Sequence, residues 1–214
     1  MKQIEIAERQ VWVHQTTDRP EWVIIQPVDE HDQQGLDEEV AWLSSHSTAT
    51  FTLVAFRISG WNQELSPWKA PAVFGREDFG EGASKTLCYV LDELVPRFKG
   101  NRYCFGGYSL AGLFALWSGC QTDVFSSIVG ASPSVWFPKW IEFAESHQMK
   151  ANRVYLSLGD KESKARNPIM AHVGECIERM HELLECEKTL EWNEGNHFKD
   201  YALRTAKGFA WAIR

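Results

Sequence analysis

The chain has 214 residues, a net charge of −7 at pH 7, and 22 lysines and arginines that form no basic run. This charge argues against a nucleic acid or an anionic membrane as a partner. The length suits one α/β domain that buries roughly 70% of its unfolded surface, so we expect a single domain over residues 1–214.

The N-terminus and the cysteines indicate the compartment. Residues 1–5 contain no apolar signal core, and no apolar stretch reaches the roughly 20 residues that a membrane span needs. The five cysteines are odd in number, irregularly spaced and without a C-x-x-C pair, which favours neither a disulfide framework nor a zinc site. We therefore expect a cytoplasmic protein with buried, reduced thiols.

The first part of the chain reads as strands separated by a helix. Alternating apolar residues predict one or two short edge strands within 1–20, and a β-branched run predicts a buried strand at 21–28. A polar loop is expected at 29–32, and apolar residues at helical spacing predict a helix of about three turns from Leu36. The next strand is expected at 51–56. Strand, helix and strand without a hairpin signal indicate a parallel crossover.

Residues 57–82 are rich in Gly, Pro and Trp and show no sustained periodicity, which is typical of a functional loop. We expect this loop to cover a site, and an amphipathic helix to follow at 87–94. Large aromatic side chains near loops can line a pocket, although core packing is the more common role of any one of them. The candidates are Trp61, Trp68, Trp136 and Trp140.

The stretch 103–119, YCFGGYSLAGLFALWSG, joins a short apolar strand to an apolar helix through a glycine-rich corner. Ser109 lies at this corner. Gly107 and Ala111 leave little side-chain bulk beside it, as in a nucleophile elbow G-x-S-x-G. Ala111 replaces the second glycine of that pattern, so the motif alone leaves a serine in an ordinary glycine-rich turn as an alternative. The amide of Leu110 opens the helix and is a candidate oxyanion donor.

The remainder of the chain continues the alternation of strands and helices. Strands are expected at 126–130, 153–158 and 189–192, and helices up to about residue 143, at 168–185 and at 201–213. This pattern predicts an α/β fold with a mostly parallel sheet covered by helices on both faces. Ligands of such sheets bind beyond the carboxyl ends of the strands.

A serine nucleophile needs a general base, which is itself oriented by an acid. His197 follows the last predicted strand and is the best-placed of the seven histidines. Glu162 and Asp160 both follow the strand at 153–158. We favour Glu162 as the acid on reach, whereas Asp160 is closer to the strand and is a candidate for capping the loop.

Four segments together resemble the esterase branch of the α/β-hydrolases, which includes enterochelin-type esterases, feruloyl esterase domains and S-formylglutathione hydrolase. They are GGYSLAG (106–112), ASPSVWF (131–137), SLGDKE (157–162) and EGNHF (194–198), and a Pro-Trp segment at 67–68 extends the likeness. The resemblance implies an α/β-hydrolase fold without a separate cap domain. It also implies a Ser109, His197 and Glu162 triad that hydrolyses a small carboxylic ester with no metal or organic cofactor.

The chain departs from that branch after the strand at 21–28, where no glycine precedes the expected second oxyanion donor. By position this donor is the backbone amide of His31. Two alternatives stay open: a ligand-binding protein that has the fold but no catalysis, and an acyltransferase or thioesterase that uses the same triad. Neither the substrate nor the oligomeric state follows from the sequence.

Overall fold

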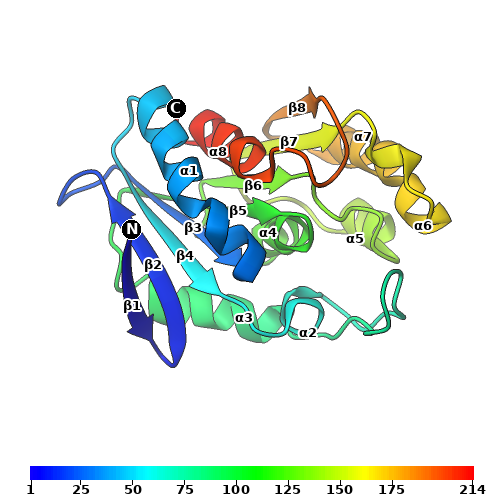
Figure 1. Ribbon diagram of the computed structural model, residues 1–214, viewed down its shortest axis with the longest axis horizontal. Helices are drawn as coiled ribbons and strands as arrows, with labels where there is room; N and C mark the ends of the chain where they lie inside the picture. Colours follow the sequence, from blue (N-terminus) through cyan, green and yellow to red (C-terminus); the bar gives the residue numbers. More distant parts are fainter.

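A computed structural model describes residues 1–214 and shows an eight-stranded sheet between layers of helices (Figure 1). The strands lie in the order β1-β2-β4-β3-β5-β6-β7-β8. Their bounds are β1 Lys2–Ile6, β2 Arg9–Gln15, β3 Trp22–Val28, β4 Phe51–Arg57, β5 Arg102–Tyr108, β6 Ser127–Ala131, β7 Arg153–Gly159 and β8 Glu187–Asn193. Only the β1–β2 and β2–β4 pairs are antiparallel. The prediction of a mostly parallel α/β sheet is therefore confirmed.

Helices cover both faces of this sheet, as Figure 1 shows. Their bounds are α1 Glu30–His46, α2 Trp61–Leu65, α3 Ala83–Tyr89, α4 Leu110–Gln121, α5 Trp140–Ser146, α6 Pro168–Ala171, α7 Val173–Leu183 and α8 Tyr201–Ala212. The helices α1 and α8 pack against each other on one face, while α3, α4, α5 and α7 contribute to the core of the other face.

The strand sequences explain why both faces are covered. Every residue of β3 is buried, and successive side chains point to opposite faces. Val23 and Ile25 belong to the larger apolar core, on the α4 side, whereas Trp22 and Ile24 belong to the smaller core under α1 and α8. A parallel strand with this continuous apolar run requires a helix layer on each side.

Helix α1 begins earlier than the sequence pattern predicts. Residues 29–32, expected as a loop, form its N-cap and first turn, because the Asp29 carboxylate accepts a hydrogen bond of 2.8 Å from the Asp32 amide. An aspartate N-cap and acidic residues in the first turn both stabilise a helix start. The helix therefore points its free N-terminal amides to the sheet edge where β3 ends.

Other predicted elements are broken or continued differently. The helix expected at 87–94 is α3 followed by a π-helical turn over Val90–Leu94, and the helix expected at 168–185 is interrupted at His172 between α6 and α7. The segment 57–82 is less irregular than predicted. It contains α2 and an isolated bridge between Ala70 and Phe79.

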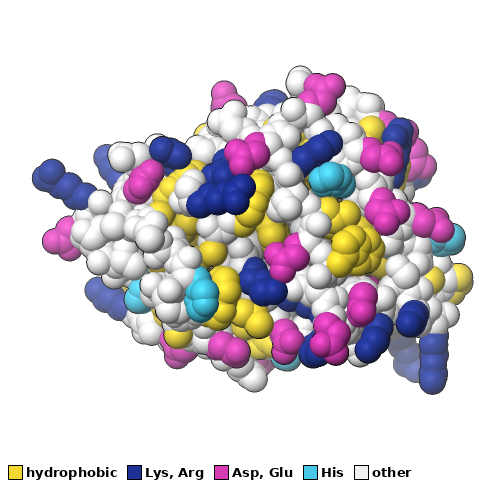
Figure 2. All heavy atoms as spheres, turned by 90° about the horizontal axis from the view of Figure 1, so that it is seen from above, with side chains coloured by type: hydrophobic (Ala, Val, Ile, Leu, Met, Phe, Trp, Pro, Cys, Tyr) yellow, Lys and Arg dark blue, Asp and Glu magenta, His cyan; other side chains and the backbone are white.

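No helix in this structure combines the length and the apolar character that crossing a bilayer requires. On the face seen in Figure 2, acidic and basic side chains are interspersed with small hydrophobic areas. All five cysteines are free, but only Cys104 and Cys120 are buried. The expectation that the thiols are buried is therefore wrong for Cys88, which is exposed, and for the half-buried Cys176 and Cys186.

Candidate active site

Ser109 lies between the end of β5 and the first residue of α4, at the sharp corner that the sequence predicts. Its φ is 56° and its ψ is −122°, a conformation that non-glycine residues rarely adopt and that costs on the order of 1 to 3 kcal/mol. A Cβ atom added to Gly107 would lie 2.6 Å from the Ala111 Cβ. Gly107 therefore makes room for Ala111, which explains how this corner accommodates alanine in place of the second glycine.

Three side chains that are distant in sequence meet at one edge of the sheet. His197 Nε2 lies 3.0 Å from Ser109 Oγ, and His197 Nδ1 lies 2.7 Å from Glu162 Oε2. Each residue follows the carboxyl end of a parallel strand, namely β5, β7 or β8. The distances form a continuous hydrogen-bonded chain from hydroxyl to imidazole to carboxylate. If Nδ1 carries the proton, Nε2 is free to accept the hydroxyl proton.

Glu162 is buried, with a side chain that is only 4% exposed, yet its surroundings favour the ionised form. Burial alone would raise its pKa, but the hydrogen bond and the charge of His197 lower it below the ordinary value. The Gly159 amide at 2.7 Å and the Ser132 hydroxyl at 2.8 Å, which both donate to Oε1, lower it further. The result is an ionised carboxylate whose other oxygen, Oε2, faces the imidazole.

Asp160, the alternative acid, lies elsewhere. Its exposed side chain accepts a hydrogen bond of 2.7 Å from the Gly195 amide, on the loop that carries His197. Gly195 has a φ of 110°, which only glycine adopts without strain. Asp160 therefore caps this loop, and Glu162 is the carboxylate that contacts the histidine.

The two expected oxyanion donors lie at helix N-termini beside Ser109. Leu110 is the first residue of α4, and His31 is the second residue of α1. Backbone amides in the first turn of a helix have no acceptor within that helix. His31 lines the cavity that contains Ser109, and its carbonyl accepts a hydrogen bond of 3.1 Å from the Tyr201 hydroxyl. The assignment of these amides as donors stays a prediction.

A cavity of about 400 Å³ opens over Ser109 and His197. Its walls are mainly aromatic: Trp61, Phe74, Tyr108, Trp136, Phe198 and Tyr201. Trp61 and Phe74 come from the segment 57–82, which therefore covers part of the site as expected. Trp68 and Trp140 do not line the cavity; Trp68 packs on Phe137 and Trp140 is 1% exposed.

The charged residues of the cavity are acidic. Asp29 and Asp32 lie on its wall, and no lysine or arginine does. Burial and the neighbouring Asp29 charge raise the pKa of Asp32 to about 7. A larger hollow of about 790 Å³ lies beside α5 and α7, but it contains neither Ser109 nor His197. No group of three or more His, Cys, Asp or Glu side chains is arranged to hold a metal ion.

The sequence patterns missed Arg204, Ser132 and Tyr108. Arg204 is 1% exposed on α8 and forms an ion pair with Glu162 at 3.0 Å. A signal was present in the sequence. Arg204 shares a helix stripe with Gly208 and Ala212, both buried, so a charged residue stands on the apolar face of an amphipathic helix. Such an arginine needs a buried partner.

No family model and no curated protein matches the chain. Solved structures do. An IroE-like serine hydrolase from Shewanella oneidensis is 14% identical with a TM-score of 0.75, over 95% of this chain and 75% of that one. The siderophore hydrolase EstB from Aspergillus nidulans is 15% identical with a TM-score of 0.70, over 99% and 94%.

A dienelactone hydrolase from Anabaena variabilis is 13% identical with a TM-score of 0.64, over 100% of this chain and 97% of that one. At these identities the likeness concerns the fold. The strand order, the helices on both faces and the strained serine corner agree with it. The chain has the α/β-hydrolase fold, with no cap domain inserted within residues 1–214.

Proposed function

We propose that this protein is a serine esterase that hydrolyses a carboxylic ester through an acyl-enzyme. The observation that carries the proposal is the continuous chain from Ser109 to His197 to Glu162, with separations of 3.0 Å and 2.7 Å. A serine on a strained elbow, a base within hydrogen-bond distance and a buried ionised acid are the parts that acyl transfer needs. One eight-stranded sheet carries all three residues, which supports a single domain over residues 1–214.

In the acylation step, Ser109 Oγ forms a bond to the ester carbonyl carbon while its proton passes to His197 Nε2. The carbonyl oxygen becomes an oxyanion, which the amides of Leu110 and His31 stabilise. When this tetrahedral intermediate collapses, the bond to the alcohol oxygen breaks and Nε2 returns the proton to that oxygen. Glu162 accepts a hydrogen bond from Nδ1–H throughout this step, and its negative charge stabilises the imidazolium while that ion exists.

In the deacylation step, water attacks the acyl carbon and gives one proton to Nε2. The bond from the acyl carbon to Ser109 Oγ then breaks, and the same proton returns to Oγ. The products are a carboxylic acid and free enzyme, so no co-reactant besides water is consumed. The atoms and charges of the cycle balance on these three side chains alone.

The cavity supports an ester with a compact apolar or aromatic group. Its volume of about 400 Å³ and its aromatic walls suit a small molecule. Structural neighbours named siderophore hydrolase and dienelactone hydrolase support an ester or lactone as the substrate class. The absence of lysine and arginine from the wall disfavours substrates that carry several negative charges.

A fluorophosphonate probe tests the nucleophile. Wild-type protein should be labelled at one residue, Ser109→Ala should not, and the exposed Ser146→Ala should be labelled like wild type. With p-nitrophenyl acetate, wild-type protein should release a burst of p-nitrophenol that matches the number of labelled sites. Equal labelling of wild type and Ser109→Ala rules out the proposal.

The two alternatives make different predictions in the same assays. A ligand-binding protein without catalysis gives no burst, yet aromatic ligands quench its tryptophan fluorescence. An acyltransferase gives a burst, but its turnover depends on an added alcohol, amine or thiol acceptor. A thioesterase turns over in water, but it cleaves a thioester faster than the matching oxygen ester. Turnover in water that is lost in His197→Ala favours the esterase.

A further inference from the structure

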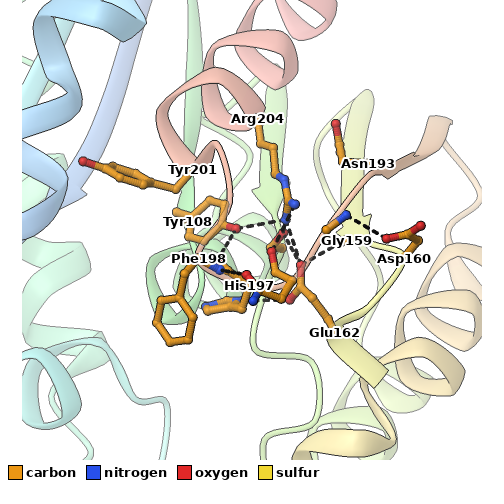
Figure 3. A network of polar contacts seen from close by, with 12 residues as sticks. Tyr108, Gly159, Asp160, Glu162, Asn193, His197, Phe198, Tyr201 and Arg204 are labelled. Atoms are coloured by element: carbon orange, nitrogen blue, oxygen red, sulfur yellow. Dashed lines mark hydrogen bonds and ion pairs between the residues drawn. The ribbon is translucent and has the colours of Figure 1, made fainter. Parts of the chain in front are cut away.

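Arg204 reaches from α8 into the space between the acid and the histidine loop (Figure 3). Its guanidinium is the largest charged group that is fully buried in the molecule. Nη1 lies 3.0 Å from Glu162 Oε1, 3.2 Å from the Ser132 hydroxyl and 3.2 Å from the Tyr108 hydroxyl. One nitrogen therefore contacts the acid directly and two further side chains around it.

The second terminal nitrogen holds the loop that carries His197. Nη2 donates to the carbonyls of Glu194 and Asn196, each at 3.1 Å. The Tyr108 hydroxyl, itself in contact with Nη1, donates to the His197 carbonyl at 2.7 Å. The loop backbone is thus held at Glu194 and Asn196 by Arg204 itself, and at His197 by a tyrosine that Arg204 contacts.

We propose that Arg204 is a positioning residue that sets the relative placement of Glu162 and His197. It contacts neither the substrate nor the reacting atoms. This inference rests on the proposed esterase function. The planar guanidinium suits the role because it presents several N–H groups in a fixed geometry, which a lysine ammonium cannot reproduce.

The placement divides the two carboxylate oxygens of Glu162 between two tasks. Oε1 accepts from Gly159, Ser132 and Arg204, so its lone pairs are occupied. Oε2 is left for His197 Nδ1 at 2.7 Å. A carboxylate held at one oxygen cannot rotate away from the imidazole, and a displacement of about 1 Å in such a relay can cost about 10²-fold in rate.

The charge of Arg204 also acts on the relay. It neutralises Glu162 while the imidazole is neutral, and it opposes the positive charge that forms on the imidazole during acylation. Removing the guanidinium charge therefore makes the imidazole–carboxylate pair hold its proton more tightly. The acidic limb of the pH profile of kcat/KM should then move to higher pH.

The test compares Arg204→Met and Arg204→Lys with Lys207→Met in p-nitrophenyl acetate hydrolysis. Lys207 is a matched control, because it is also a cation on α8 paired with a carboxylate, Glu191, at 2.9 Å, but it does not touch Glu162 or His197. Active sites are counted by fluorophosphonate labelling carried to completion, because a variant with slow acylation shows no burst, so that unfolded protein does not contribute to kcat. Thermal unfolding is recorded for each variant.

For Arg204→Met we expect kcat per active site to fall about 10²-fold, KM to stay within about twofold, and the acidic limb to rise by about half a pH unit or more. For Arg204→Lys, which keeps the charge, we expect a fall of about tenfold and an unmoved limb. For Lys207→Met, kcat should stay within about twofold of wild type.

A folded Arg204→Met variant with kcat within threefold of wild type, or with the acidic limb at the wild-type pH, overturns the inference. If Arg204→Met does not fold, Arg204→Lys decides, and kcat within threefold of wild type overturns it. These outcomes are distinct from failure of the proposed function, because in that case wild-type protein itself shows neither labelling at Ser109 nor turnover.

Discussion

Glu162 and Glu39 are both buried glutamates, but they lie in regions that treat a carboxyl group in opposite ways. Glu162, at the carboxyl end of the sheet, has His197, Arg204, Ser132 and the Gly159 amide as partners, and its pKa is lowered. Glu39, on the inner side of α1, has one hydrogen-bond partner, Gln26, at 2.8 Å. Burial raises the pKa of Glu39 to about 8.

This difference shows that the number and charge of the partners, and not burial itself, decide whether a buried carboxyl group is ionised. The region around Glu162 is built to hold a charge at a fixed point. The region around Glu39 tolerates a carboxyl group only by keeping it protonated at neutral pH. The first arrangement is typical of a functional site.

The strongest test of the comparison removes the charge of Glu162. Glu162→Gln keeps the shape of the side chain but has no negative charge to stabilise the imidazolium, and its NH2 group can donate to Nδ1 and favour the wrong tautomer. We therefore expect kcat to fall about 10³- to 10⁴-fold with a smaller change in KM. Asp160→Asn is the control: it weakens only the cap on Gly195, and kcat should fall less than about tenfold. Similar losses in both variants would contradict the assignment of Glu162.

Glu39→Gln tests the other region. Between the unfolded pKa near 4.5 and the folded pKa of about 8, the folded protein keeps a proton that the unfolded chain releases, so the free energy of unfolding falls as pH rises. Glu39→Gln removes this loss and should be more stable than wild type by roughly 4 kcal/mol at pH 8, and by about 1 kcal/mol at pH 5. Urea unfolding at both pH values measures the difference.

Glu162 should give the opposite pH dependence. Because its folded pKa is lowered, it stabilises the protein above the unfolded pKa near 4.5, and this contribution disappears as pH falls through the folded value. In Glu162→Gln, part of the acid-induced loss of stability should be absent. Urea unfolding of wild type and Glu162→Gln between pH 6 and pH 3 should show curves that converge toward acid, and parallel curves would contradict the lowered pKa.

A smaller effect is expected at the aromatic wall of the cavity. Trp136 is only 8% exposed and lies against Phe74 and Phe79, with ring centroids 6.1 Å and 6.2 Å apart. Trp136→Ala should raise KM for p-nitrophenyl esters with an aromatic acyl group by about tenfold and leave kcat within about threefold, because the ring binds substrate and not the reacting atoms. An unchanged KM would place the acyl group elsewhere.

The smallest effect concerns Asp32, a carboxyl group intermediate between the two glutamates, with a pKa of about 7. As pH rises from 6 to 8, Asp32 becomes negatively charged and attracts the positively charged trimethylammonium group of a choline ester. KM for the choline ester should therefore fall by about threefold relative to KM for its uncharged 3,3-dimethylbutyl isostere. Asp32→Asn should abolish this divergence. A divergence of the same size in Asp32→Asn would assign it to another group.

The sequence was informative where chemistry follows chain order. Ser109, His197 and Glu162 could be placed at one edge because each follows a predicted parallel strand. Arg204 could not, since it lies within α8 and not after a strand, and its contact with Glu162 depends on how α8 packs on the sheet. The start of α1 was misplaced because a capping aspartate and a polar loop look alike by periodicity.

The tryptophans show the same limit. Position near a loop could not separate Trp136, which faces the cavity, from Trp140, which packs inside the protein. Side-chain direction after β6 depends on Ser132 and Lys139, two non-glycine residues with positive φ. Nothing in the apolar pattern of 131–140 indicates those backbone angles.

The positive φ of Ser109 has a practical consequence for capturing the natural ligand. Glycine adopts this backbone conformation without strain, so Ser109→Gly should melt at a higher temperature than wild type while losing its nucleophile. Such a variant keeps the cavity open and cannot consume what enters it. Under the proposed function it should bind the substrate without cleaving it, so that mass spectrometry can identify a molecule that co-purifies with Ser109→Gly and not with Ser109→Gly,Trp136→Ala.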